Sequence, residues 1–197
     1  ILFDIQDVGA RFYTYISTVQ GILRAAAGMA GCLRVVVLDR PNPLGSVVEG
    51  PPLQPEFRSF VGVTSALPLR HGLTMGEVAR VLAAEEGVAV EVIPTDQPFV
   101  WHANRPWVPP SPNLPDLKNV RLYAATALIE ALDVSEGRGT PLPFRWIGAP
   151  NLDPLALANA FNTQMADLYA GWQQPVWLTA RPAFLTPSTS KHAGQRC

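Results

Sequence analysis

Apolar residues in the first forty positions form two short runs separated by a helical stretch. The run 1–5 is apolar and short, as in strands that are buried in parallel sheets. Over 15–29 the apolar residues recur at helical spacing, and glycines at its end provide a stop signal. The run 33–38 is β-branched and apolar on both faces. A strand, a helix and a strand in this order predict a right-handed parallel unit.

The remaining pattern alternates long proline-rich loops with short elements. In order, it predicts a loop over 41–55, a strand over 60–64, a helix over 74–86, a strand over 88–93, a loop over 94–117, helices over 119–132 and 154–166, and a strand over 176–178. The helix that starts at Thr74 carries a capping box with Glu77, and Gly87 ends it. Alternating strands and helices predict an α/β fold. The pattern changes past Phe144, which predicts a domain boundary between residues 147 and 148.

Composition narrows the possible function classes. The chain is 48% hydrophobic and only 16% charged, which excludes a disordered protein. Its 15 basic residues are balanced by 16 acidic ones, so we expect no nucleic-acid partner bound through bulk charge. No stretch approaches the roughly 18 consecutive apolar residues of a membrane span. Its 20 prolines indicate stiff, ordered loops.

Common cofactor and nucleophile motifs are absent from the sequence. Neither GxGxxG nor GxxxxGK[ST] occurs, and there is no GxSxG elbow. The three histidines and two cysteines are too scattered for a zinc site. We therefore expect no cofactor and no metal.

Acids and arginines follow the strands predicted over 1–5 and 33–38. Asp4, Asp7 and Arg11 come after the first strand, and Asp39 and Arg40 after the second. Ligands of open parallel sheets bind at the carboxyl ends of the strands, so these residues predict a site there. Alternatively, Asp4 and Asp39 only bind loop amides.

Other polar groups could complete such a site. Tyr13 and Tyr15 lie at the helix start, where packing at the edge of the core is the alternative role. Glu136 and Arg138 share a glycine-rich turn and could equally form an internal ion pair. Asn113 lies in the second proline-rich loop, where Trp101 and Trp107 could also stack on a sugar. Acids, arginines and aromatic residues suit carbohydrate chemistry, in which two carboxyl groups usually share the work.

Seven segments, taken together and in order, resemble the NamZ-type exo-β-N-acetylmuramidases. They are Asp4-Ile-Gln-Asp-Val-Gly-Ala-Arg-Phe-Tyr-Thr-Tyr15, Asp39-Arg-Pro-Asn-Pro-Leu-Gly45 with Glu49-Gly-Pro51, Arg70-His-Gly-Leu-Thr74, Pro110-Ser-Pro-Asn-Leu-Pro115, Ser135-Glu-Gly-Arg-Gly-Thr140 with Pro143-Phe144, Gly148-Ala-Pro150, and Ser190-Lys-His-Ala-Gly194. Together they extend over essentially the whole chain.

The resemblance implies a bacterial glycoside hydrolase that removes N-acetylmuramic acid from the non-reducing ends of peptidoglycan fragments. It also implies a Rossmann-like parallel-sheet domain, here 1–147 without its N-terminal part, followed at 148–197 by the start of a smaller α/β domain, with the site between them. The family has an upstream Pro-Glu-His-Gly segment that bears the glutamate thought to be catalytic, and this chain does not contain it. Both ends of the chain resemble cut ends, so we expect an internal fragment whose own activity is in question.

Site roles carried over from the resemblance fall into two groups. The catalytic candidates are Asp4, Asp7 and Glu136, of which one aspartate would act as partner carboxylate or position water. The substrate-binding candidates are Arg11, Tyr13, Tyr15, Asn113, Arg138 and His192, with Arg11 facing the lactyl carboxylate of the muramic acid. The expected partner is a muropeptide or a MurNAc-GlcNAc sugar, and the expected location is outside the cytoplasm, with any export signal upstream of Ile1.

Two rival functions stay open from the sequence. One is a non-catalytic carbohydrate-binding domain on the same scaffold, since a fold does not determine function. The other is an α/β domain that binds a different anionic small molecule through Arg11 and Arg138.

Overall fold

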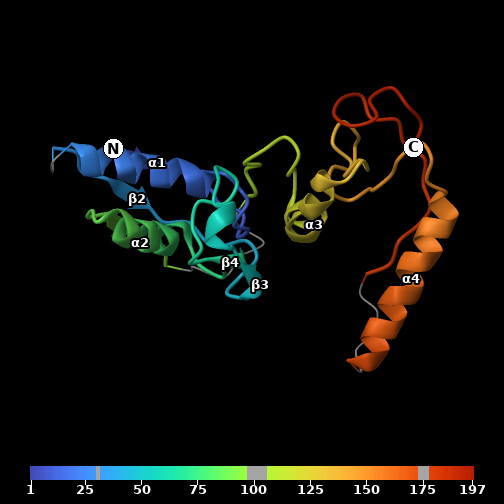
Figure 1. Cartoon of the computed structure of the whole chain (residues 1–197), viewed down its shortest axis with the longest axis horizontal. Coiled ribbons are helices and arrows are strands. Elements are labelled where there is room, and N and C mark those ends of the chain that lie inside the picture. The colour runs from blue at the N-terminus through green and yellow to red at the C-terminus, as the bar shows by residue number, and fades with distance from the viewer. Residues whose placement is uncertain (30–31, 97–105, 173–177) are drawn as a thin grey trace. The chain divides into compact units, whose positions relative to one another are not determined.

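A computed structural model describes residues 1–29, 32–96, 106–172 and 178–197 (Figure 1). The chain divides into two compact units, Ile1–Ala124 and Ala125–Cys197. The position of the domain boundary predicted between residues 147 and 148 lies within the second unit. Each unit is described by itself.

The first unit contains a three-stranded parallel sheet in the order β1-β2-β5. Its strands are β1 (Leu2–Phe3), β2 (Val36–Leu38) and β5 (Glu91–Ile93). Phe3 pairs with Val37, which in turn pairs with Val92. The connection from β1 to β2 is helix α1 (Tyr15–Gly28). The predicted parallel unit and the α/β class are thereby confirmed.

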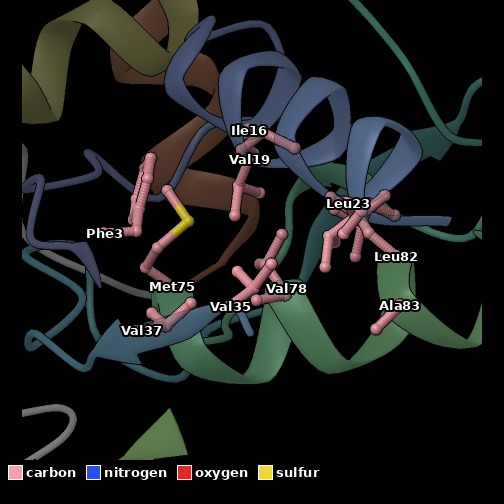
Figure 2. Packing of buried hydrophobic residues seen from close by; sticks show 13 residues of the cluster. Phe3, Ile16, Val19, Leu23, Val35, Val37, Met75, Val78, Leu82 and Ala83 are labelled. Carbon is pink, nitrogen blue, oxygen red and sulfur yellow. The ribbon is translucent and has the colours of Figure 1, made fainter. Parts of the chain in front are cut away.

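Helix α1 and helix α2 (Met75–Glu86) pack against the sheet and each other. Figure 2 shows Ile16, Val19 and Leu23 of α1 meeting Val78 and Leu82 of α2 above the β2 side chains, all within one buried cluster. Full burial of each such side chain contributes about 1.5–3 kcal/mol. This core includes Phe3 of β1 and Val37 of β2, so it fixes the positions of the strand ends that carry the candidate site residues.

Local signals determine the ends of α2. The Thr74 hydroxyl accepts a hydrogen bond from the backbone N–H of Glu77, whose carboxylate accepts one from the N–H of Thr74. Gly87 ends the helix in the left-handed region with a φ of 67°. The predicted capping box and glycine stop are confirmed.

A small antiparallel sheet corrects two expectations. The expected loop over 41–55 contains β3 (Glu49–Pro52), which pairs with β4 (Pro68–Arg70). The strand expected over 60–64 is wrong, because Ser59 and Gly62 form only an isolated bridge across a turn. Phe60 and Val61 are exposed there, so the apolar run is not buried as a strand would require. A short 3-10 helix, η1 (Pro55–Phe57), precedes that turn.

The second unit is built from helices and ordered turns. Helix α3 (Leu117–Thr126) crosses from the first unit and continues as the 3-10 helix η2 (Ala127–Ala131), so the helix expected over 119–132 is confirmed with a tighter last turn. Helix α4 (Pro154–Gly171) starts at the Asp153 cap and extends five residues beyond its predicted end. Most of the strand expected over 176–178 lies outside the described residues. None of the helices in the described ranges is both long and apolar enough to cross a membrane.

Candidate functional site

The ends of β1 and β2 bring Asp4 and Arg40 together. The Oδ1 atom of Asp4 lies 2.7 Å from both Nε and Nη2 of Arg40. The two side chains are 45% and 41% exposed, respectively. An ion pair this exposed contributes about 0–1 kcal/mol to stability. The Asp4 carboxylate is therefore oriented, yet open to a ligand.

Asp39, unlike Asp4, is bound by groups at the start of α2 and has a structural role. Its Oδ2 atom accepts a hydrogen bond from the Thr74 hydroxyl at 2.8 Å, and its Oδ1 atom accepts one from the Gly76 N–H at 2.7 Å. A carboxylate in this position satisfies free N–H groups at the start of α2 and complements the helix dipole. The amide-binding alternative is confirmed for Asp39.

Asp7 forms a buried pair with His71. The Asp7 Oδ2 atom accepts a hydrogen bond from the Gly9 N–H at 2.7 Å and lies 3.2 Å from His71 Nε2. His71 Nδ1 accepts a hydrogen bond from the Leu73 N–H, so Nε2 carries the ring proton and donates a hydrogen bond to Asp7. Asp7 Oδ1 is buried and has no hydrogen-bond partner among the described residues. His71 was not a predicted site residue, although its segment was among those that matched the family.

Arg11 lies against the β3–β4 sheet. Its N–H donates to the Leu69 carbonyl at 2.9 Å. Its Nη1 atom donates to the carbonyls of Leu67 at 2.7 Å and Pro51 at 2.9 Å. Burial lowers the pKa of the Arg11 guanidinium.

One of the two tyrosines at the start of α1 contacts the second proline-rich loop. The rings of Tyr13 and Tyr15 meet edge to face at 5.0 Å, and the Tyr15 hydroxyl donates to the Pro110 carbonyl at 2.9 Å. Asn113 lies in the turn that follows Pro110, where its N–H donates to the Ser111 hydroxyl at 3.2 Å. Burial raises the pKa of the Tyr13 phenol, and the neighbouring Tyr15 hydroxyl adds to the effect. Of the two loop tryptophans, Trp101 lies outside the described residues.

Glu136 and Arg138 form the internal ion pair that was the alternative prediction. Glu136 is 1% exposed, and its Oε1 atom lies 3.2 Å from Nη1 of Arg138. The Nη2 atom of Arg138 lies 2.7 Å from Oε1 of Glu130, and its guanidinium stacks over Phe144. Burial lowers the pKa of Arg138, but hydrogen bonds and charges from both glutamates outweigh it and raise the pKa overall.

Lys191 binds carbonyls at the end of η2 and lies near Glu136. Its Nζ atom donates to carbonyls that close η2, at 2.8 Å to Glu130 and 2.6 Å to Leu132, and lies 3.9 Å from Glu136 Oε2. Next to it, His192 Nε2 lies 3.3 Å from the Asp133 carbonyl. Lys191 was not a predicted site residue, and membership in the Ser190–Gly194 segment was its only signal.

Three residues in the second unit have strained backbone conformations. Phe144, Ser190 and His192 occupy the left-handed region, with φ values of 59°, 69° and 57°. Such conformations cost a non-glycine residue on the order of 1–3 kcal/mol and concentrate at functional sites. Over the described ranges, no group of three or more His, Cys, Asp or Glu residues could hold a metal ion.

The predicted residues are thus divided between the two units. The first unit holds Asp4, Asp7, Arg11, Tyr13, Tyr15 and Asn113, and the second holds Glu136, Arg138 and His192. The molecule is an α/β protein with acids and arginines at the carboxyl ends of parallel strands, where open α/β sheets bind ligands.

Family models agree with this description. The N-terminal domain model of the exo-beta-N-acetylmuramidase NamZ matches residues 1–118, and the C-terminal domain model matches residues 121–197. The chain belongs to the NamZ family.

Individual relatives support the assignment. The chain is 40% identical over 205 aligned positions to the peptidoglycan beta-N-acetylmuramidase NamZ of Bacillus subtilis strain 168, covering 100% of this chain and 46% of the relative. Crystal structures of two DUF1343 family proteins from Bacteroides fragilis match with TM-scores of 0.78 and 0.70 at 29% and 30% identity. These matches cover 99% and 100% of this chain, but 50% and 51% of the two structures. The chain thus spans about half the length of these relatives.

Proposed function

We propose that the protein is a glycoside hydrolase that releases N-acetylmuramic acid from the non-reducing ends of peptidoglycan fragments. Membership in the NamZ family supports this activity, as does the activity for which the Bacillus subtilis relative is named. The substrate would be a muropeptide or a MurNAc-GlcNAc sugar. Such a reaction needs carboxyl groups and neither a metal nor a nucleotide.

The observation that carries the proposal is the open Asp4 carboxylate at the end of β1. A reacting carboxylate must reach the sugar, and Asp4 is 45% exposed. Asp7 and Glu136 are 3% and 1% exposed and are held in internal pairs. We therefore assign Asp4 as the carboxylate that contacts the sugar or its attacking water. Asp7 and Glu136 would each act as a structural group within its own unit.

Tyr13, Tyr15 and Asn113 are suited to contact the sugar. The tyrosine rings provide apolar faces with polar tips, which suits a pyranose ring. The bond from Tyr15 to the Pro110 carbonyl keeps the loop of Asn113 beside them. An amide side chain can both donate to and accept from sugar hydroxyls or an acetamido group.

Arg138 is poorly suited to bind a free anion. Its guanidinium already contacts the carboxylates of Glu130 and Glu136, which cancel its charge. This counts against the rival function that used Arg138 to bind an anionic small molecule. The experiment below must distinguish a hydrolase from the other rival, a non-catalytic sugar-binding domain.

The experiment measures release of a chromophore from a β-N-acetylmuramide by the full-length protein. Asp4→Asn should lower turnover by about 100-fold or more, because general acid–base groups contribute about 10²–10⁴-fold. Its stability should change by less than about 1 kcal/mol, because the ion pair with Arg40 is exposed.

Arg40→Gln is the matched control. It breaks the same ion pair but keeps the Asp4 carboxylate, so it should lose far less turnover than Asp4→Asn. Equal loss in both variants would show that the ion pair, rather than the carboxylate, matters. A folded wild-type protein that binds the sugar without cleaving it would leave only the binding function.

We infer an extracytoplasmic location, periplasmic or secreted, because peptidoglycan lies outside the cytoplasmic membrane. Fractionation of cells that express the full-length protein tests this. Recovery only with cytoplasmic markers would refute it.

A further inference from the structure

The side chain of Gln6 connects the loops that follow β1 and β2. Its Nε2 atom donates to the Asp7 carbonyl at 2.8 Å and to the Pro41 carbonyl at 2.9 Å. A primary amide has two N–H donors and one carbonyl acceptor, so both donors of Gln6 are in use. The orientation of the amide is thereby determined, because its nitrogen faces two carbonyls that can only accept.

The Oε1 atom of Gln6 is left as a hydrogen-bond acceptor. It has no hydrogen-bond partner among the described residues, and it is not one of their buried unsatisfied oxygens. Gln6 is partly exposed, so this oxygen is open to a ligand. A free glutamine amide can offer either a donor or an acceptor to a ligand, whereas this one can only accept.

Gln6 lies at the same edge of the sheet as the carboxylate that we assign to the sugar. Asp4 contacts Arg40 from the end of β1, and Gln6, two residues further on, contacts Pro41, which directly follows Arg40. Both contacts join the loops after two paired parallel strands. Open α/β sheets bind ligands at this edge, so a ligand that contacts Asp4 also meets the Gln6 acceptor.

An acceptor that is held in place can discriminate between ligands. Two hydrogen bonds already hold the Gln6 amide, so little side-chain entropy is lost when a ligand binds to it. A ligand with a donor at this position gains a hydrogen bond. A ligand without one leaves the oxygen unpaired, which costs binding free energy.

We propose that Gln6 is a specificity-determining residue that accepts a hydrogen bond from an O–H or N–H group of the sugar next to Asp4. The sugar as ligand rests on the proposed function, and the acceptor rests on the contacts of Gln6. A non-reducing N-acetylmuramyl residue offers the 4-hydroxyl, the 6-hydroxyl and the acetamido N–H as donors, because its 3-oxygen carries the lactyl ether.

Calorimetry with the full-length protein measures the affinity for N-acetylmuramic acid. Gln6→Lys keeps N–H donors for the two carbonyls but has no acceptor, and Gln6→Met has neither. Both variants should bind about fivefold or more weakly, as expected for the loss of one hydrogen bond. Gln54→Met, at an exposed glutamine of the same unit, is the matched control and should leave the affinity unchanged.

Analogues of the sugar identify the donor that Gln6 binds. They are the 4-deoxy form, the 6-deoxy form and a form in which N-methylation removes the acetamido N–H. Loss of the contacted donor should weaken binding to the wild type by about fivefold or more. In Gln6→Lys the same loss should change the affinity by less than about twofold. Each comparison is made within one protein, so the charge of the lysine affects both ligands alike.

A merely structural role predicts a different pattern. If Gln6 only joins the two loops, Gln6→Met should lose affinity for every ligand, and Gln6→Lys should restore it. Full affinity for N-acetylmuramic acid in Gln6→Lys therefore overturns the proposal. So does an equal loss for every analogue in the wild type and in Gln6→Lys.

These outcomes are distinguishable from failure of the proposed function. Binding of the sugar that depends on Gln6, without any hydrolysis by the wild type, would retain the acceptor and reject the hydrolase. Normal hydrolysis by the wild type with an unchanged KM in Gln6→Lys would retain the hydrolase and reject the acceptor.

Discussion

Lys191→Met should destabilise the second unit of the protein. The Nζ atom of Lys191 lies within hydrogen-bond distance of four carbonyls, of Ile129, Glu130, Leu132 and Val134, at 3.4, 2.8, 2.6 and 3.2 Å. These carbonyls surround the end of η2, so the ammonium acts as its C-terminal cap. Methionine preserves the length and apolar stem of the side chain but donates nothing.

The magnitude follows from the donor count. An ammonium has three N–H groups, so at most three of the four carbonyls are bound at once. The Ile129 carbonyl also accepts a hydrogen bond from the Leu132 N–H and loses least. Hydrogen bonds to charged groups contribute about 1.5–3 kcal/mol each, and water replaces part of this for a side chain that is 29% exposed. We therefore expect the free energy of unfolding to fall by about 2–4 kcal/mol.

Urea unfolding followed by circular dichroism measures this loss. Because the chain has two compact units, the change should appear in the transition that belongs to the second unit. Lys118→Met is the matched control, since Lys118 is exposed at the start of α3. It should change stability by less than about 0.5 kcal/mol. A loss below about 1 kcal/mol in Lys191→Met, or one equal to that of the control, would refute the capping role.

Two further predictions test the packing of the loops and the environment of the tyrosines. Gly139→Ala should destabilise the protein by about 2 kcal/mol or more in thermal unfolding, because φ is 76° and a Cβ would lie 2.5 Å from the Thr189 carbonyl oxygen. Gly21 lies in α1 with open space around it, so Gly21→Ala should instead stabilise the protein by about 0.5–1 kcal/mol. Unfolding temperatures that shift in the same direction in both variants would contradict the reasoning. The raised pKa of Tyr13 means that above pH of about 10 the unfolded chain releases a proton that the folded protein keeps, so stability should fall as the pH rises. Urea unfolding at alkaline pH should show a shallower fall for Tyr13→Phe, and an identical slope would contradict it.

The parts of the fold that the sequence predicted correctly have local signals. Helix α2 has its capping box and glycine stop within the segment itself, and β2 is a continuous β-branched run. By contrast, β3 and β4 are proline-bearing strands that form only by pairing with each other, and Arg11 binds carbonyls beside both. No local pattern of residues reports such a pairing.

The same distinction applies to the candidate site. That Asp4 meets Arg40 could be predicted, because parallel strands bring their carboxyl ends to one edge of the sheet. That Asp7 meets His71 could not, because 64 residues separate them and their contact depends on how β4 lies against the turn at Gly9. Lys191 was missed for a related reason, since its carbonyl partners lie about 60 residues earlier along the chain.

Asp4, Asp7 and Asp39 all lie near adjacent strand ends, and only the folded structure distinguishes their roles. From the sequence all three are site candidates, and Asp4 and Asp39 have amide binding as an alternative role. Their surroundings then separate them. Asp39 accepts hydrogen bonds at the N-terminus of α2. Asp7 accepts a hydrogen bond from the Gly9 N–H and pairs with His71. Asp4 pairs with Arg40, and both of these side chains are partly exposed. A reacting carboxylate in an enzyme must be both oriented and accessible to the substrate, and a carboxylate that is buried or bound by backbone amides is oriented but not accessible. On this physical ground Asp4, rather than its buried neighbours, should contact the sugar.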